Sequence, residues 1–312
     1  MNFKEKSKQI KSLALEIGFD ACGIAKAEPL PQNTEALKSW LNKSYNSGMK
    51  YMENNISKRF DITRLVENAK SVIVVLSSYN PTEFPFQQKH LKMSRYTLVR
   101  DYHVVIKNKL LYLLKKINQN FGSTAGRAFV DSGPLFEKAW AQKAGLGWIG
   151  KNSLLINKEF GSFCFIGELV IDTELDYDSS VQMDCGTCNK CVENCPTHAI
   201  VNPRVINAGI CIAYNTIENK DPIHENVKNK MNGWIYGCDI CQEVCPWNYK
   251  SAKASKTEFI SFDPLKKMTD IDWENLSRDD YNKLFKNSPV RRARFDRLKN
   301  NINAVLSQNS TK

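Results

Sequence analysis

The chain has 312 residues, 42% of them hydrophobic, and a formal net charge of +11 at pH 7. This is the composition of an ordinary globular protein that is long enough to bury a substantial core. No run of about 18 apolar residues occurs, and the charged start lacks the apolar region of a secretory signal, so we expect a cytoplasmic protein without a membrane span. The positive charge fits either a polyanionic partner such as a nucleic acid or a solvated, self-repelling surface.

The first part of the chain alternates between predicted helices and strands. Apolar residues at helical spacing predict a first helix that ends at Gly18, and FDACGIAKA then predicts a short strand. Residues 34–53 favour a helix. The β-branched run SVIVVLSSY, residues 71–79, predicts a strand that is buried on both faces. Residues 101–117 predict a long amphipathic helix with a strongly apolar face.

The alternation continues to about residue 180. RAFVD predicts a short strand that ends at Asp131, residues 135–144 favour a helix, and SFCFIGELVI predicts a further strand. We therefore expect an α+β domain with layered helices and sheet over residues 1–180. Short turns spaced by cysteines predict a second domain over residues 181–250. A basic, weakly patterned segment with one last helix occupies residues 251–312.

The loop AGLGWIG has the spacing G-x-G-x-x-G at Gly145, Gly147 and Gly150. In a dinucleotide-binding site this spacing follows a strand and begins a helix. Here it follows a predicted helix, and the sequence has no phosphate-binding P-loop. The sequence therefore does not support a nicotinamide or flavin dinucleotide site.

Eight of the ten cysteines lie between residues 185 and 245. The stretch CGTCNKCVENCP spaces four of them as C-x2-C-x2-C-x3-C-P, and CDICQEVCP repeats this spacing without the first cysteine. In a chain without a secretion signal, such a cluster indicates a metal site rather than disulfides. The spacing is typical of cubane [4Fe–4S] clusters in bacterial two-cluster ferredoxins, whereas zinc, the alternative, prefers two separated pairs of ligands.

In two-cluster ferredoxins the cysteine before the proline binds the other cluster, so the two ligand sets are crossed. The first cluster is therefore predicted to bind Cys185, Cys188, Cys191 and Cys245. The second is predicted to bind Cys195, Cys211, Cys238 and Cys241, with Cys211 in place of the missing cysteine. The alternative is a second cluster with three cysteine ligands and a structural Cys211. A large domain in front of two clusters indicates an enzyme to which the clusters supply electrons.

Taken in order, five motifs resemble those of the epoxyqueuosine reductases, which complete queuosine in transfer RNA: VDSGPLFEKAWAQKAGLGWIGKN, GSFCFIGEL, CGTCNKCVENCP, GICIAYNTIE and IYGCDICQEVCPWN. The resemblance covers most of residues 10–250 and includes the SRYTLVRDYH segment. It implies a nitroreductase-like domain that holds base-off cobalamin, followed by a ferredoxin-like domain with two [4Fe–4S] clusters. It further implies that the clusters reduce the cobalamin, and that the enzyme reduces the epoxide of the modified wobble base.

The resemblance implies that Asp131 is the proton donor. A carboxyl group at the end of a strand is also a usual catalytic position in sheets covered by helices, and burial would have to raise its pKa for it to act as an acid near neutral pH. From the residues alone, a helix N-cap is an equal alternative. The resemblance also implies cobalamin contacts from Arg59, Tyr96, Asp131, Lys151, Asn152, Ser153, Ser162 and Tyr214, although Arg59 and Lys151 are also consistent with simple surface charges.

The triplet Asp101-Tyr102-His103 resembles the start of the D-x-H-x-x-G signature of proteins that supply a histidine ligand to cobalt. Ile106 occupies the position of the glycine, and the segment lies in a predicted amphipathic helix. We therefore expect His103 to have a structural role and not to bind cobalt.

Transfer RNA is the partner that the resemblance implies. Phosphate contacts are expected from basic residues near the end of the chain: Lys250, Lys253, Lys256, Arg291, Arg292 and Arg294. We expect a flavodoxin- or ferredoxin-type protein to reduce the clusters, and the enzyme to be a monomer. Two alternatives are a cobalamin-dependent reductive dehalogenase and a non-catalytic ferredoxin-like electron carrier; the second leaves the large first domain without a role.

Overall fold

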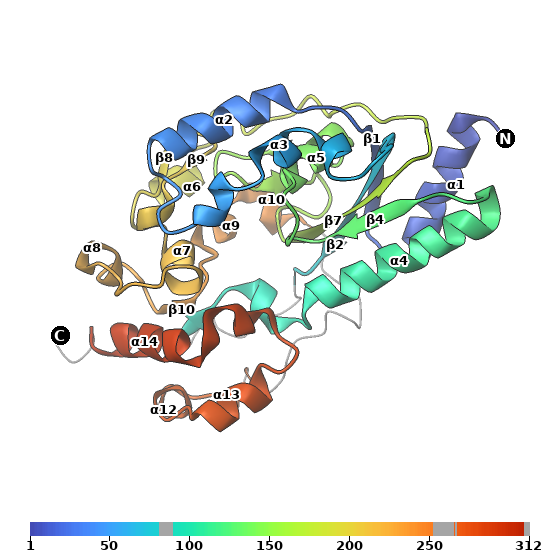
Figure 1. The fold of residues 1–312 in the computed structure, drawn as a ribbon. Helices are drawn as coiled ribbons and strands as arrows, with labels where there is room; N and C mark the ends of the chain where they lie inside the picture. Colours follow the sequence, from blue (N-terminus) through green and yellow to red (C-terminus); the bar gives the residue numbers. More distant parts are fainter. Residues whose placement is uncertain (81–89, 252–264, 266, 309–312) are drawn as a thin grey trace.

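An antiparallel sheet lies at the centre of the computed structural model, which describes residues 1–80, 90–251, 265 and 267–308 (Figure 1). Its strands are, in spatial order, β1 (Ala21–Lys26), β2 (Ser71–Ser78), β7 (Cys164–Ile171) and β4 (Gly126–Phe129). β2 and β7 pair along their full length, from Ser71 opposite Ile171 to Ser78 opposite Cys164. Every residue of β2 is buried, as its β-branched run predicts.

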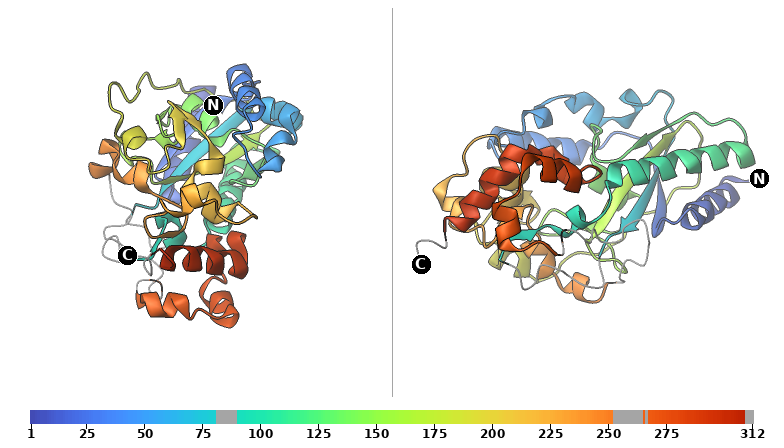
Figure 2. Two further views of the ribbon diagram at one scale, coloured as in Figure 1. Left: turned by 90° about the vertical axis from the view of Figure 1, so that its left-hand side faces the viewer. Right: turned by 90° about the horizontal axis from the view of Figure 1, so that it is seen from below.

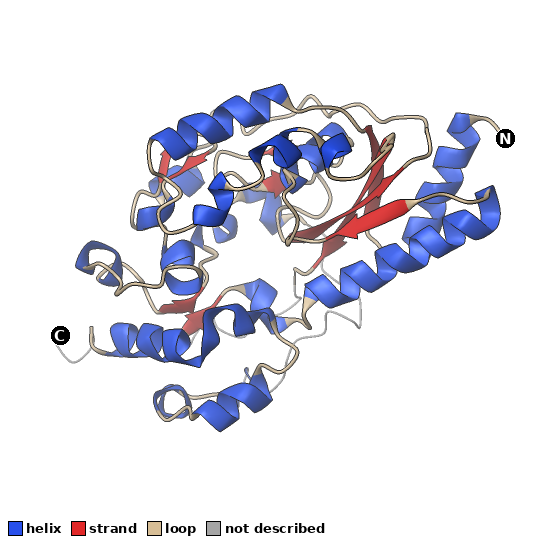
Figure 3. Ribbon diagram, in the orientation of Figure 1, coloured by secondary structure: helices blue, strands red, loops and turns tan. Residues whose placement is uncertain are grey.

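Helices cover both faces of the sheet (Figures 1 and 3). One face carries α1 (Phe3–Glu16) and α4 (Tyr102–Phe121); the other carries α5 (Glu137–Lys143), with α2 (Pro31–Asn42) and α3 (Ile56–Phe60) beyond it. Side chains of β2 alternate between the two hydrophobic cores because successive residues of a strand point to opposite faces. Ile73 packs with α1 and α4, and Val74 packs with α5. The layered arrangement expected for this part of the chain is therefore confirmed.

Short elements build the cysteine-rich segment. Contact between α6 (Lys190–Glu193) and α9 (Ile240–Glu243) brings the two cysteine motifs together. The hairpin of β8 (Ile200–Asn202) and β9 (Val205–Ile206), α7 (Ile212–Ile217) and α8 (Glu225–Lys228) lie between the motifs in sequence. The helix α10 (Pro246–Tyr249) begins at the proline that follows Cys245, a position where the missing N–H of proline is not needed.

A further hydrophobic core joins the end of the chain to the cysteine-rich segment. The helices α12 (Asp270–Glu274), α13 (Arg278–Leu284) and α14 (Arg294–Leu306) gather at one end of the molecule (Figure 2). They share this core with β10 (Trp234–Tyr236), which pairs in parallel with β3 (Lys92–Met93). Trp273 and Phe285 are almost completely buried in it. The sequence predicts only the last helix, because α12 and α13 are too short to show a helical period.

The other sequence predictions hold within a few residues, with one exception. Residues 34–53 do not form one helix: α2 ends at Asn42 and a 3-10 turn occupies Lys50–Glu53. Ser44 and Ser47 adopt positive φ angles of 54° and 49°, which interrupt the helix. No helix in the described ranges is long and apolar enough to cross a membrane. The domain boundaries at residues 180 and 250 stay predictions.

Candidate active site

Asp131 lies in the loop after β4, where its backbone has a φ of 57°. This left-handed conformation is uncommon outside glycine, although aspartate and asparagine tolerate it better than most residues. The backbone N–H of Asp131 donates a hydrogen bond to Glu137 Oε1 at 2.5 Å, at the start of α5. The N-cap of α5 is Phe136. Asp131 is therefore not the helix cap that its sequence allows, and its side chain is directed to α4 instead.

The partners of the Asp131 carboxylate lie in the first turn of α4. Its Oδ2 atom accepts a hydrogen bond from the Tyr102 hydroxyl at 3.2 Å and lies 3.0 Å from Nε2 of His103. The other ring nitrogen, Nδ1, lies 2.7 Å from Oδ1 of Asp101, which is the N-cap of the helix. Ionised carboxylates only accept hydrogen bonds, so this geometry favours a proton on both nitrogens of His103 and a positive charge on the ring.

The pKa values of the two groups follow from this contact. Burial lowers the pKa of His103, but the hydrogen bonds to Asp101 and Asp131 and the charges of both carboxylates outweigh burial and raise it to about 9. The hydrogen bond from His103 lowers the pKa of Asp131 more than burial raises it. The net rise in pKa that an acid near neutral pH would need is therefore not met in this structure, because the hydrogen bond from His103 outweighs burial at a side chain that is still 54% exposed.

Two glutamates lie behind the Asp131 loop. Glu168, in β7, is fully buried, and its carboxyl oxygens meet no hydrogen-bond donor in the described part of the chain. Its neighbour is the carboxyl group of Glu137, so burial and the adjacent negative charges raise the pKa of both groups, that of Glu137 to about 7. A proton shared by the pair removes the repulsion. The glutamate inside the otherwise apolar SFCFIGELVI is the sequence signal that could have indicated this pair.

Two basic side chains from distant segments meet at Tyr51, and one of them, Arg292, acts on Asp131. Arg292, in the 3-10 turn Pro289–Ala293, pairs with Glu218, lies 6.0 Å from the ring centre of Tyr51 and helps to lower the pKa of Asp131. Arg59, on α3, donates hydrogen bonds to the backbone carbonyls of Tyr51 and Asn54. The end of the chain thus reaches the surroundings of Asp131, a contact that no sequence motif indicates.

The loop at residues 150–154 connects the surroundings of Asp131 with the cysteine-rich segment. It joins β5 (Trp148–Ile149) to β6 (Leu155–Ile156). On one side, Nδ2 of Asn152 donates to the carbonyl of Cys241 at 3.4 Å. On the other side, the Ser153 carbonyl accepts a hydrogen bond from Lys138, which adjoins Glu137, at 2.7 Å. The Ser153 hydroxyl is buried and has no hydrogen-bond partner among the described residues, so it is available to a bound polar group.

The remaining residues predicted to bind cobalamin lie at different places. Tyr96 packs edge-on against Tyr102, with ring centres 6.4 Å apart, and is therefore close to Asp131. The Tyr214 hydroxyl accepts a hydrogen bond from the backbone of Gly48 at 2.7 Å. Lys151 and Ser162 bind the cysteine-rich segment: Lys151 donates to Asn189 and the carbonyl of Gly186, and Ser162 donates to Gln242. The role of each residue in binding cobalamin stays a prediction.

The cysteine thiols fall into two neighbouring sets. Burial raises the pKa of Cys245, and the nearby Cys185 and Cys188 raise it further; Cys185 and Cys245 act in the same way on Cys191. In the second set, burial raises the pKa of Cys241, and Cys211, Cys195 and also Cys191 of the first set are among the groups that add to it. Burial, Cys241 and Cys211 likewise raise the pKa of Cys238.

Apart from Cys191, which acts on both Cys241 and its own set, these neighbours are consistent with the crossed ligand pattern, and the ligands themselves stay a prediction. Among the described residues, no three His, Cys, Asp or Glu side chains converge to hold a single metal ion. The cysteines of a cubane bind separate irons, so they do not need to converge on one point.

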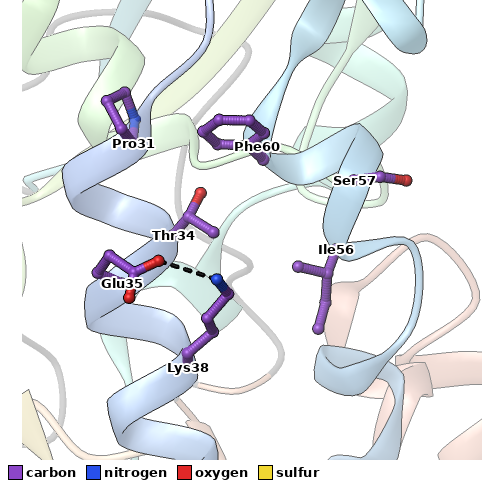
Figure 4. Close-up of a pocket in the computed structure, with 7 residues that line it drawn as sticks. All are labelled: Pro31, Thr34, Glu35, Lys38, Ile56, Ser57 and Phe60. Carbon is purple, nitrogen blue, oxygen red and sulfur yellow. Dashed lines mark hydrogen bonds and ion pairs between the residues drawn. The ribbon is translucent and has the colours of Figure 1, made fainter.

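A cavity of about 340 Å³ lies between α2 and α3 (Figure 4). Side chains of the two helices line it, and a 2.9 Å ion pair between Lys38 and Glu35 lies at its edge. None of the predicted site residues lines this cavity, although Arg59 belongs to α3. We therefore regard it as separate from the site at Asp131.

The cysteine-rich segment is similar to a known type of iron–sulfur domain. Residues 184–248 match the family model of a 4Fe-4S double cluster binding domain, and this range contains all eight cysteines of the two sets. Together with the α+β domain in front of it, this match defines a redox enzyme that carries two iron–sulfur clusters.

The family follows from the rest of the chain. Residues 59–132, which end just after Asp131, match the model of epoxyqueuosine reductase QueG. The epoxyqueuosine reductase of Leadbetterella byssophila is 46% identical over 96% of this chain and 98% of its own length. A crystal structure of epoxyqueuosine reductase with an epoxyqueuosine-modified tRNA-Tyr stem loop has a TM-score of 0.89 at 26% identity and covers 98% of this chain and 82% of that chain. The chain belongs to the epoxyqueuosine reductase family, oxidoreductases that act on transfer RNA, and the predicted fold is confirmed.

A catabolic reductive dehalogenase is also similar in structure. It has a TM-score of 0.52 at 14% identity, and covers 83% of this chain and 33% of that chain. A likeness at this identity shows a shared fold alone. The dehalogenase alternative is not favoured, and neither is an electron carrier without catalytic activity, because the full-length relative is an epoxyqueuosine reductase.

Proposed function

We propose that this protein reduces epoxyqueuosine to queuosine in transfer RNA, with Asp131 delivering a proton to the epoxide oxygen. The observation that carries the proposal is the Asp131 site itself. Its carboxylate is held by Tyr102 and His103, and its backbone by Glu137. This site lies in a chain that is similar along its whole length to epoxyqueuosine reductases.

Two [4Fe–4S] clusters fit the two sets of thiols, with Cys185, Cys188, Cys191 and Cys245 as ligands of one and Cys195, Cys211, Cys238 and Cys241 as ligands of the other. The second set of thiols lies next to Asn152, whose side-chain amide donates a hydrogen bond to the carbonyl of Cys241. The loop at residues 150–154 therefore offers a short protein path from this cluster to the surroundings of Asp131. A flavodoxin- or ferredoxin-type protein remains the expected electron donor, and a monomer the expected state.

We expect cobalamin to bind between the Asp131 loop and the cysteine-rich segment, the two regions that the loop at residues 150–154 connects. When it is bound, cobalamin supplies a strongly reducing cobalt centre. The Ser153 hydroxyl, which has no partner among the described residues, is the group that we expect to meet one of the cobalamin amides, and Tyr96 packs against Tyr102, a partner of Asp131. Arg59, which binds the carbonyl of Tyr51, is a further expected contact. The protein's part in the reaction is to orient the carboxyl group of Asp131 and to protonate the oxygen as it leaves.

Transfer RNA fits the net charge of +11. Lys250, Arg291 and Arg294 are exposed, and we propose that they contact phosphates. Arg292 is paired with Glu218 and lies near the candidate active site. We therefore propose that it contacts a substrate inside the site and not an outer phosphate. Lys253 and Lys256 lie outside the described residues.

The decisive experiment is nucleoside analysis of transfer RNA from a strain in which the gene is deleted. We expect epoxyqueuosine to accumulate and queuosine to return when the gene is restored. A matched strain that carries Asp131→Asn should continue to accumulate epoxyqueuosine. A deletion strain with normal queuosine and no epoxyqueuosine would reject the proposed function.

A further inference from the structure

The contact between Asp131 and His103 places a second proton-carrying group beside the predicted acid. At neutral pH the proton of this pair belongs to the imidazole ring, because the pKa of Asp131 is lowered and that of His103 is raised. A carboxylate without its proton cannot act as an acid. The structure therefore raises the question of where the transferred proton is held before the reaction.

We propose that His103 is a positioning residue that stores the proton which Asp131 delivers, so that the linked side chains of Asp101, His103 and Asp131 form the proton source. The proposal rests on the proposed function and extends it to a residue for which the sequence predicts only a structural role. Three contacts carry it: Asp101 Oδ1 to Nδ1 at 2.7 Å, Asp131 Oδ2 to Nε2 at 3.0 Å, and the backbone N–H of His103 to Asp101 at 3.1 Å. They fix the ring with Nε2 directed at Asp131.

The proposed proton transfer supplies the protons that the reduction consumes. Reduction of an epoxide to an alkene consumes two electrons and two protons, and the oxygen leaves as water. The electrons come from the reduced cofactors. For each proton, the Nε2–H bond of His103 breaks, the Asp131 carboxylate relays the proton, and an O–H bond forms on the substrate oxygen. The side chain of His103 is 34% exposed, so water can return a proton to the ring.

Other charged groups around the pair influence both pKa values. Asp101 faces His103 from the helix cap, and Tyr102 and Arg292 face Asp131 from α4 and from the end of the chain. The additional groups whose charges interact with Asp131 are Tyr51, Glu137, Lys138 and Glu168. The Asp101 carboxylate is the one among these groups that bonds to Nδ1, the ring nitrogen that does not face Asp131. It is therefore the group through which the proton store can be tuned without altering Asp131.

The pH dependence separates a proton store from a structural contact. His103 has a raised pKa, so the pair carries its proton below pH 9 and loses it as the pH rises through about 9. In His103→Gln the amide can still bond to Asp131 but carries no transferable proton. Asp131 alone must then be protonated, and a carboxyl group has an ordinary pKa of about 4. The alkaline limb of the rate profile should therefore move to acid pH.

The first test measures single-turnover rates of the pre-reduced holoenzyme on epoxyqueuosine-containing transfer RNA between pH 6 and pH 9.5. We expect His103→Gln to lose about a hundredfold in rate at pH 7.5 and to recover part of the loss at pH 6. Asp101→Asn keeps a good helix cap but removes the negative charge that raises the pKa of His103. The alkaline limb of its rate profile should therefore move by about one pH unit toward acid pH. Lys107→Gln, an exposed change on the same helix, should match the wild type.

The second test does not depend on turnover. The chain has four histidines, so ¹⁵N-imidazole NMR can follow each ring, and His103→Gln identifies the signal of interest. We expect a titration midpoint near 9 that falls toward the ordinary histidine range in Asp131→Asn. A midpoint near 6.5 in the wild type, the ordinary value for histidine, would overturn the proposal, as would a His103→Gln rate loss that is the same at every pH. A wild-type enzyme without turnover would instead reject the proposed function.

Discussion

At the scale of single residues, Asp131 combines an unusual backbone with a charged partner. Its φ of 57° is stabilised by the hydrogen bond from its N–H to Glu137, and its carboxylate is fixed by His103 and Tyr102. The contact with Glu137 is local, but those with His103 and Tyr102 are not, since these residues lie 28 and 29 positions earlier in the chain. The sequence identifies the candidate acid through its resemblance to a family, but the direction of its pKa shift depends on a cation from another helix.

Asp131→Asn tests the acid without disturbing the fold. Asparagine tolerates positive φ and has nearly the same size, so the loop and α5 should be unaffected. We expect full iron content, unchanged cobalamin binding measured by absorption spectroscopy, and a rate lower by about 10²–10⁴-fold, the usual contribution of a positioned acid. A rate within a few-fold of the wild type would exclude Asp131 as the proton donor.

At the scale of elements, short helices and loops place the cysteines. The contact between α6 and α9 joins the two motifs, and Cys211 immediately precedes α7. Cys211 is half-buried, and both burial and nearby Cys195 raise the pKa of its thiol. If Cys211 binds the second cluster, its position beside Cys195 and Cys241 would complete the motif that lacks a cysteine. The motif spacing alone left a three-cysteine second cluster open.

Cys211→Ala tests this position. If Cys211 binds the second cluster, anaerobically purified protein should fall from about eight irons per chain, the content of two cubanes, to about four. The matched control is Cys22→Ala in β1, which should keep about eight. Iron should be measured against protein and compared with the absorbance of the clusters. Unchanged iron content in Cys211→Ala would support the alternative of a structural Cys211.

At the scale of the whole molecule, the end of the chain supports the cysteine-rich segment. The helices α12, α13 and α14 share a core with β10, and β10 ends two residues before Cys238. The same segment brings Arg292 close to Asp131. Residues near the C-terminus therefore affect both the second set of thiols and the candidate active site, which their weak sequence pattern does not suggest.

Phe285→Ala tests this support. Phe285 is fully buried between the C-terminal helices, so its loss should lower the free energy of unfolding by about 3–5 kcal/mol and weaken retention of the second cluster. Ile271→Ala, at a side chain that is 68% exposed on α12, should change the free energy by less than about 0.5 kcal/mol. Urea unfolding followed by circular dichroism, with iron content after dialysis, measures both effects. Equal midpoints for the two variants would contradict a structural role for this core.

Features that depend on local order along the chain could be predicted from the amino-acid sequence. β2 and α4 follow from the type and period of their side chains, and the two cysteine motifs follow from the spacing that a cubane requires. Their order, with that of the neighbouring motifs, also indicated the family, and the full-length relatives confirm it.

Which distant groups meet depends on the three-dimensional fold. The helix cap Asp101 and the ring of His103 become parts of the site because α4 begins beside the loop after β4. The buried pair Glu137 and Glu168 forms because α5 packs on β7. Charges and pKa values depend on these three-dimensional neighbours, and no periodicity or motif of a single segment contains them.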